Sequence, residues 1–184
     1  MDRPIAGNIV LIGFLCSGKS TTGKILSQAL SLRFFDIDHQ LEDEIGPIPR
    51  FVEQFGTAAF RRREYQLLVD TMPAEGAVIA TGAGTIMPMR SRKLLEAFAP
   101  RVFFLDAPFQ LLYGRMAALP LYLCRRPDFL AAPQEQGRAR MFNEYQQRRP
   151  LYQSLGIALD AARPPQDVAE DIIKALFPQT RAAR

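Results

Sequence analysis

The sequence predicts an α/β fold in which helices cover both faces of a five-stranded parallel sheet. Short apolar runs of strand length alternate with longer segments of helical spacing, which is the pattern of repeated β-α units. The short runs are mainly apolar on both faces, as expected of parallel strands that are buried on both faces. A glycine-rich loop between the first run and the first helical segment suits such a unit. These observations predict a three-layer architecture.

Five segments are predicted to be strands. Residues 8–12 (NIVLI) form the first, and residues 33–36 form a short second strand. Residues 77–81 (AVIAT) and 101–105 (RVFFL) are the next two apolar runs, and residues 156–159 supply the fifth strand.

Six segments carry the spacing of helices with one apolar face. They are residues 19–30, 58–72, 90–97, 108–117, 134–149 and 165–176. Pro108 and Pro165 suit first-turn positions, where a missing amide hydrogen leaves no helical bond unmade.

One long segment lacks regular spacing. Residues 118–133 contain three prolines and paired arginines, which predicts a mobile loop that could act as a lid. Residues 178–184 are expected to fray. A chain of 184 residues has room for one domain, predicted over residues 1–177.

The composition excludes several classes of protein. Hydrophobic residues make up 48% of the chain and charged residues 23%, as in ordinary globular domains. No apolar run approaches the roughly 20 residues that span a bilayer. Residues 1–4 lack the regions of a signal peptide, so a cytoplasmic location is expected. Cys16 and Cys124 are too few and too scattered for a disulfide framework or a zinc site.

The net charge of +4 comes largely from arginine clusters at 61–63, 125–126 and 148–149. Most such clusters are solvated faces, but this distribution also suits anionic ligands such as nucleotides and carboxylates. Aromatic residues are not interleaved with these charges as stacking platforms, so nucleic acid is not an expected partner.

The most specific motif is GFLCSGKS at residues 13–20, which fits G-x-x-x-x-G-K-[ST] between a predicted strand and a predicted helix. The glycines let backbone N–H groups converge on a polyphosphate, and Lys19 reaches its β- and γ-phosphates. Ser20 supplies a hydroxyl to Mg²⁺. The predicted contacts of ATP are Gly13, Cys16, Ser17, Gly18, Lys19, Ser20 and Thr21. The alternative is a glycine-rich turn that merely caps a helix.

A D-x-D motif, Asp36 and Asp38, ends the second predicted strand. Because strand side chains alternate, both carboxylates are expected on one side. Asp36 could then hold Mg²⁺ through water, while Asp38 could accept the proton of an attacking hydroxyl. A structural alternative is that the pair caps the following helix. His39, the only histidine, is expected to be exposed rather than catalytic.

From this motif onward the chain resembles the shikimate kinase family. Residues 60–64 (FRRRE) are similar to its F-R-x-x-E, residues 81–84 (TGAG) to its Gly-Gly-Gly turn, and residues 148–152 (RRPLY) to its R-x-P-L-Y. The resemblance implies a P-loop fold like that of the nucleoside monophosphate kinases, with a mobile lid. It also implies a monomeric enzyme that uses ATP and Mg²⁺ to phosphorylate the 3-hydroxyl of shikimate.

The same resemblance assigns the acceptor site. It implies that Asp38, Arg61 and Arg148 bind shikimate, with backbone amides of the turn Gly82, Ala83 and Gly84 completing the pocket. A guanidinium offers a planar fork of donors that matches a carboxylate.

Other residues are assigned to the nucleotide side. Arg126, followed by a proline, resembles the start of the lid motif R-P-L-L, whose arginine folds over the phosphates. Catalysis would then depend on Lys19, Asp38 and Arg126. Arg115 and Arg163 match the arginines on the adenine side.

Three departures from the family pattern affect these assignments. Ala83 replaces a glycine, and a positive φ there would cost roughly 1–2 kcal/mol. Asp128 and Phe129 stand where the family has two leucines. The segment between Arg115 and Arg126 is longer than usual, so Arg125 is an alternative lid arginine. A kinase for another hydroxy acid such as gluconate, and a nucleotide-binding protein without catalysis, therefore remain alternatives.

Overall fold

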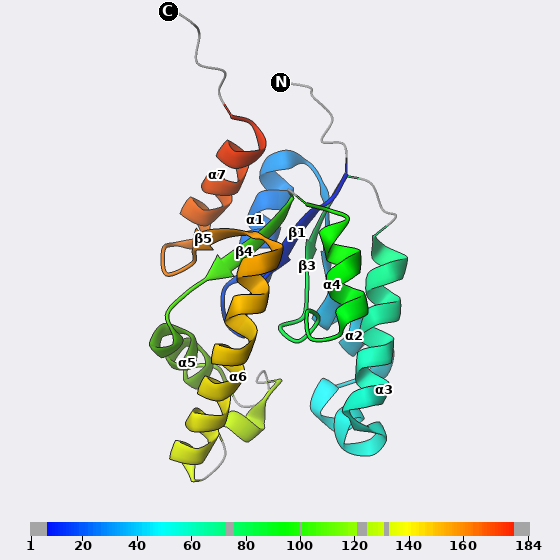
Figure 1. Cartoon of the computed structure of the whole chain (residues 1–184), viewed down its shortest axis with the longest axis vertical. Coiled ribbons are helices and arrows are strands. Elements are labelled where there is room, and N and C mark those ends of the chain that lie inside the picture. The colour runs from blue at the N-terminus through cyan, green and yellow to red at the C-terminus, as the bar shows by residue number, and fades with distance from the viewer. Residues whose placement is uncertain (1–6, 73–75, 100, 121–124, 131–132, 179–184) are drawn as a thin grey trace, which may run out of the picture.

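The computed structural model describes residues 7–72, 76–99, 101–120, 125–130 and 133–178. Its five strands form one parallel sheet in the order β2-β3-β1-β4-β5 (Figure 1). The strands are β1 (Ile9–Ile12), β2 (Arg33–Asp36), β3 (Ala77–Ala80), β4 (Val102–Asp106) and β5 (Ile157–Asp160). The predicted sheet is confirmed, with each strand within one residue of its expected bounds.

Helices cover both faces of this sheet (Figure 1). They are α1 (Lys19–Leu30), α2 (Ile37–Ile45), α3 (Ile48–Thr71), α4 (Met89–Glu96), α5 (Phe109–Ala117), α6 (Gln134–Leu155) and α7 (Pro165–Leu176), with a 3₁₀ turn, η2 (Pro127–Phe129). α1 packs against α7 and β3, and α6 packs against β4, α4 and α5. None of the helices in the described ranges is long and apolar enough to cross a membrane.

The core is centred on β1, whose four residues are fully buried. Val10 pairs with Ile79 on β3 and with Val102 on β4, so β1 lies in the middle of the sheet. The prediction that every strand is buried on both faces is wrong for β2 and β5. They are the edge strands, and Ile157 on β5 is 44% exposed. Because helices cover the edges less completely, burial is nearly complete only in the three inner strands, where Asp106 at the end of β4 is the one partly buried residue.

The helical predictions missed α2 and the extent of two other helices. α3 begins ten residues before its predicted start at 58 and contains Gly56 at φ +81°, a kink that interrupts the apolar spacing. α6 continues through Pro150 instead of ending at 149. Pro150 removes one helical hydrogen bond. Burial of Tyr152 and Leu155 in the next turn offsets that loss.

The expected loop at 118–133 is only partly described. Its residues 127–129 form η2, and the side chain of Phe129 is fully buried in the core. The expectation that this segment lacks a packed element is therefore wrong for η2. Its mobility stays a prediction, since residues 121–124 and 131–132, with Cys124 among them, lie outside the described ranges. The tail that is expected to fray, residues 178–184, lies outside them except for Pro178, so the fraying stays a prediction.

One buried side chain joins β1 to the segments around β3. Asn8 Nδ2 donates to the Met72 carbonyl at 2.7 Å, and its Oδ1 accepts from the Ala77 amide at 3.1 Å.

We expect Asn8→Ala to lower the free energy of unfolding by about 2 kcal/mol, because both buried backbone groups lose their partners. Urea denaturation measures this change. Gln66→Ala, which removes an exposed hydrogen bond to Asp70, should change it by less than about 0.5 kcal/mol. Equal values for the two variants would contradict the expectation.

Candidate active site

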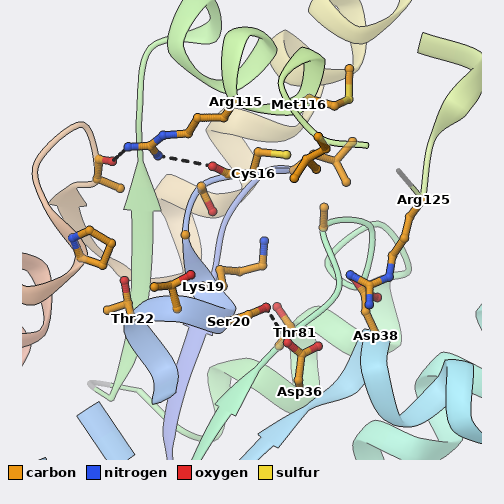
Figure 2. Close-up of a pocket in the computed structure, with 18 of the residues that line it drawn as sticks. Cys16, Lys19, Ser20, Thr22, Asp36, Asp38, Thr81, Arg115, Met116 and Arg125 are labelled. Atoms are coloured by element: carbon orange, nitrogen blue, oxygen red, sulfur yellow. Dashed lines mark hydrogen bonds between the residues drawn. The ribbon is translucent and has the colours of Figure 1, made fainter. Parts of the chain in front are cut away.

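A cavity of about 520 Å³ opens at the carboxyl ends of the inner strands. β2 and β3 lie on one side of β1, and β4 and β5 lie on the other, so the chain changes direction at β1. Ligands of open α/β sheets bind at such a switch point. Figure 2 shows Lys19, Asp36, Asp38 and Arg125 around this cavity. Its other lining includes the predicted residues Cys16, Ser17, Gly18, Ser20, Thr21, Ala83, Arg115, Arg126 and Arg163.

The loop between β1 and α1 has the geometry of a phosphate cradle. Gly13 has φ +152°, and a Cβ there would overlap the Leu105 carbonyl oxygen and Ser17 Oγ. Gly18 has φ +93° and is the N-cap of α1, so the amides of the first helical turn point into the cavity. Ser17 Oγ is buried and finds no hydrogen-bond partner in the described ranges. An anion at this helix N-terminus would satisfy these donors.

Lys19 lies at the base of this cradle. Its Nζ donates to the carbonyl oxygens of Gly13 at 3.0 Å and Phe14 at 2.9 Å, which draws the loop around the ammonium group. Burial lowers the pKa of Lys19, while Asp38 and Asp36 oppose that shift. Cys16 has φ +57°, a left-handed conformation that is unusual for a residue with a side chain.

Asp36 has two roles in the structure. Its Oδ2 accepts a hydrogen bond from Ser20 Oγ, and its Oδ1 accepts one from the His39 amide at 3.2 Å. The two residues predicted to hold Mg²⁺ therefore lie together. The alternative of a helix cap also holds for Asp36, which is the N-cap of α2. The His39 side chain is 67% exposed and lies 3.5 Å from Asp43, which confirms the prediction that it is exposed.

Asp38 lines the same cavity, but the element that positions it differs from the one predicted. It lies in the first turn of α2 rather than on a strand, so strand alternation does not explain its direction. β2 passes directly into α2, and this junction brings the two carboxylates together (Figure 2). Burial raises the pKa of Asp38 to about 6, an effect that the positive charges of Arg125 and Lys19 oppose. A carboxyl with this pKa can accept a proton near neutral pH.

The turn after β3 is packed tightly against charged side chains. A Cβ on Gly82 would overlap Asp38 and Glu64, and one on Gly84 would overlap the Arg61 guanidinium. Ala83 does not share the positive φ that is found at Cys16 and Ser31. The strain considered for Ala83 is therefore absent, and glycine is needed on either side of it for close approach instead.

Two arginines lie behind this turn. Arg61 Nη1 is 2.5 Å from Glu64 Oε2, and the opposite oxygen of Glu64 accepts from Thr85 Oγ1 at 2.6 Å. Glu64 is 2% exposed. Arg148 is also buried, pairs with Glu144 and has its guanidinium carbon 5.6 Å from the centroid of the Phe14 ring. Neither arginine lines the cavity described above.

Tyr152 belongs to the site, although from the sequence it was noted only as the last residue of the R-x-P-L-Y motif. It is 1% exposed, its ring stacks on Phe104 with centroids 5.1 Å apart, and its hydroxyl donates to the Ala83 carbonyl oxygen. Glu64 was also quoted without a role. Its position three residues after Arg61 on a helix was the signal for that contact.

The other end of the cavity holds the two remaining predicted arginines. Arg115 donates to the Cys16 carbonyl oxygen at 3.3 Å and to the Ala161 carbonyl oxygen at 3.1 Å, so it joins the phosphate loop to the turn after β5 (Figure 2). Arg163 follows that turn and pairs with Asp171 at 2.5 Å. Both residues line the cavity, and their assignment to the adenine side stays a prediction.

Comparison with known proteins identifies the family. The family model for shikimate kinase matches residues 15–177. This chain belongs to the shikimate kinase family. A shikimate kinase of Aquifex aeolicus is 32% identical over 169 residues, which cover 91% of this chain and 95% of that protein.

Solved structures agree with membership of the shikimate kinase family. A shikimate kinase from Acinetobacter baumannii in complex with shikimate has a TM-score of 0.84 at 26% identity, covering 97% of each chain. A gluconokinase from Sinorhizobium meliloti has a TM-score of 0.62 at 16% identity, covering 96% of this chain and 94% of that chain. At that identity the second likeness shows a shared fold alone.

Proposed function

We propose that this chain transfers the γ-phosphoryl group of ATP to the 3-hydroxyl of shikimate, giving ADP and shikimate 3-phosphate. The observation that carries the proposal is that Lys19 and the phosphate cradle share one cavity with Asp38, a half-buried carboxyl whose raised pKa lets it take a proton near neutral pH. Membership of the shikimate kinase family supports the acceptor. The chain would act as a monomeric domain, residues 1–177, in the cytoplasm.

The nucleotide would lie along the cavity from Arg115 and Arg163 to Lys19. The amides of the loop and the free Ser17 hydroxyl would bind the phosphates. Ser20 Oγ and Asp36 Oδ2 are adjacent hard oxygen donors, and Mg²⁺ prefers such a site with one carboxylate, phosphate oxygens and water. When bound, Mg²⁺ would neutralise charge on the β- and γ-phosphates.

Shikimate would lie on the opposite side of Asp38. Arg61 and Arg148 are the cations proposed to bind its carboxylate, with amides of Gly82, Ala83 and Gly84 beside its ring. Glu64 holds the Arg61 guanidinium from behind, which reduces the freedom that the side chain would lose on binding. Tyr152 holds the Ala83 carbonyl and so fixes the turn between these groups.

The reaction needs little covalent chemistry from the protein. The shikimate hydroxyl oxygen forms a bond to the γ-phosphorus while the bond from that phosphorus to the bridging oxygen breaks, and ADP leaves with the electron pair. Asp38 accepts the hydroxyl proton. Lys19 and Arg126, on the initial assignment, would offset the charge on the phosphoryl oxygens, so catalysis consists of positioning and electrostatic stabilisation.

An ADP-release assay with a panel of acceptors tests this function. We expect acceptor-dependent turnover with shikimate and none with gluconate or nucleoside monophosphates. Turnover with gluconate but not with shikimate would show that the enzyme phosphorylates another hydroxy acid instead. Binding of magnesium-bound ATP without turnover on any acceptor would instead indicate a nucleotide-binding protein.

The turn at residues 82–84 gives a matched pair of substitutions. We expect Gly84→Ala to raise the KM for shikimate by about tenfold or more, because the added methyl group displaces the Arg61 guanidinium. Ala83→Gly should leave that KM within about twofold, since Ala83 needs no positive φ. Steady-state kinetics at saturating ATP measure both values. A lower KM in Ala83→Gly would mean that the turn is strained after all.

A further inference from the structure

Arg125 and Arg126 both line the cavity, but their surroundings differ. Arg126 donates two hydrogen bonds to Asp128, each at 2.9 Å, and two to Glu144, at 3.1 and 2.9 Å. Its guanidinium carbon also lies 3.7 Å from the centroid of the Phe129 ring. Two carboxylates and an aromatic face therefore already satisfy Arg126.

The contacts of Arg126 join η2 to α6. Arg140 of α6 donates to the Asp128 carbonyl oxygen at 2.7 Å, and a Cβ on Gly137 would overlap the Phe129 carbonyl oxygen. Glu144 serves Arg148 as well as Arg126. To reach a phosphate, Arg126 would have to leave both of its carboxylates together. Asp128 would then lose its ion pair, and Glu144 would keep only Arg148. Arg126 is thus built into the packing between two elements.

Arg125 has a single carboxylate partner within the described residues, Glu42. Its Nε and Nη2 donate to the same Glu42 oxygen at 2.9 and 2.6 Å. Figure 2 shows the guanidinium directed toward Asp38, across the cavity from Lys19. A γ-phosphoryl group between Lys19 and Asp38 would lie within the reach of Arg125 after a change in its side chain alone.

Glu42 connects this arginine to the acceptor side. It lies on α2 four residues after Asp38, so both carboxylates project from the same face of one helix. Burial raises the pKa of Asp38 to about 6, and among the surrounding charges that of Arg125 opposes this shift most. The helix that presents Asp38 to the acceptor thereby also holds Arg125 beside it.

We propose that Arg125, held by Glu42, is the arginine that offsets charge on the transferred phosphoryl group, and that Arg126 fixes η2 to α6. The proposal rests on the kinase function proposed above and replaces the initial assignment of this role to Arg126. While the bond to the acceptor oxygen forms and the bond to the bridging oxygen breaks, Arg125 donates N–H groups to the phosphoryl oxygens. Glu42 is a positioning residue.

Three variants separate the two arginines. We expect Arg125→Ala to lower kcat by about 100-fold, as the loss of a donor to transition-state charge does. Its melting temperature should fall by about 2 °C or less, because only the ion pair with Glu42 is lost. Arg126→Ala should keep kcat within about tenfold and melt about 5 °C lower, because Asp128 loses its ion pair and the link from η2 to Glu144 of α6 is removed. Arg50→Ala, on an exposed position of α3, is the control. Where Arg126→Ala does not fold, Arg126→Lys replaces it.

Two further measurements detect a role that packing alone would not produce. Guanidinium ion at millimolar concentration should restore part of the activity of Arg125→Ala and none of that of Arg126→Ala. Glu42→Gln should lower kcat about tenfold without changing the KM for the acceptor, and adding Glu42→Gln to Arg125→Ala should cause no further loss.

A further measurement does not depend on the identity of the acceptor. It is the affinity for magnesium ADP with aluminium fluoride, which takes the place of the transferred phosphoryl group. Arg125→Ala should weaken that affinity by about 100-fold, whichever hydroxy compound the enzyme phosphorylates. Failure of shikimate as a substrate would therefore refute the proposed function and leave this measurement valid. Equal losses in Arg125→Ala and Arg126→Ala, or a loss confined to Arg126→Ala at normal melting temperature, would overturn the proposal.

Discussion

Lys19→Met is expected to lower kcat at least about 10³-fold and to weaken the binding of magnesium-bound ATP. The ammonium group of Lys19 is the cation at the base of the phosphate cradle, where its Nζ contacts the carbonyl oxygens of Gly13 and Phe14. In that position it would meet the β- and γ-phosphates, where charge shifts as the phosphoryl group leaves. Methionine fills a similar volume and carries no charge, so the variant isolates the electrostatic contribution.

The effect should be confined to ligand binding and chemistry. Lys24→Met changes an exposed lysine on the same helix and should leave kcat within about twofold. Burial already lowers the pKa of Lys19, which means that folding disfavours its charged form. Loss of Lys19 should therefore not destabilise the protein, and thermal unfolding of both variants should match that of the unmodified chain. A Lys19→Met enzyme that kept more than a tenth of the original kcat would contradict this role.

The sheet and the phosphate loop could be predicted because their signals are local. Residues 9–12 are a continuous apolar run, and the loop motif lies between that run and a helix whose bounds, 19–30, were predicted correctly. The edge strands were harder to judge, because β2 (RFFD) has two aromatic residues between charged ends, and even these aromatic residues are only partly buried. Sequence shows which residues can be buried, and the strand order decides which ones are.

The candidate site was predictable to the extent that each residue follows a strand. Asp36 ends β2, and Gly82 follows β3, so both had to lie at the carboxyl edge of the sheet. The pairing of Arg126 with Glu144 joins residues from different elements and could not be inferred from spacing. For the same reason Tyr152 and the Ala83 carbonyl, 69 residues apart in the chain, could not be paired from the sequence.

The choice between Arg125 and Arg126 shows how far a motif can be carried over. The resemblance assigned the lid role by the proline that follows Arg126. Asp128, which departs from the family pattern, occupies that arginine in the structure. On the proposal above, a substitution within the R-P-L-L motif moves the role of its arginine by one residue, to Arg125.

Asp38→Asn is expected to lower kcat by at least about 100-fold and toward 10³-fold, because asparagine cannot accept the proton of the attacking hydroxyl.

The pH dependence of kcat/KM in the unmodified enzyme should follow the ionisation of the Asp38 carboxyl. Since the pKa of Asp38 is raised to about 6, kcat/KM should fall about tenfold for each pH unit below that value. The residual activity of Asp38→Asn should lack this decline. A variant with a near-normal rate would remove Asp38 from proton transfer.

The raised pKa of Asp38 also predicts that the inactive variant is the more stable one. Between the ordinary value of 3.8 and about 6, the unfolded carboxyl ionises while the folded one stays protonated, so this group lowers stability as pH rises through that window. Above pH 6 the full penalty is up to about 3 kcal/mol, and less where water in the open cavity hydrates the carboxylate. Asp38→Asn removes that penalty. Its gain in stability, measured by urea denaturation, should therefore be largest at pH 7 to 8 and vanish below about pH 4.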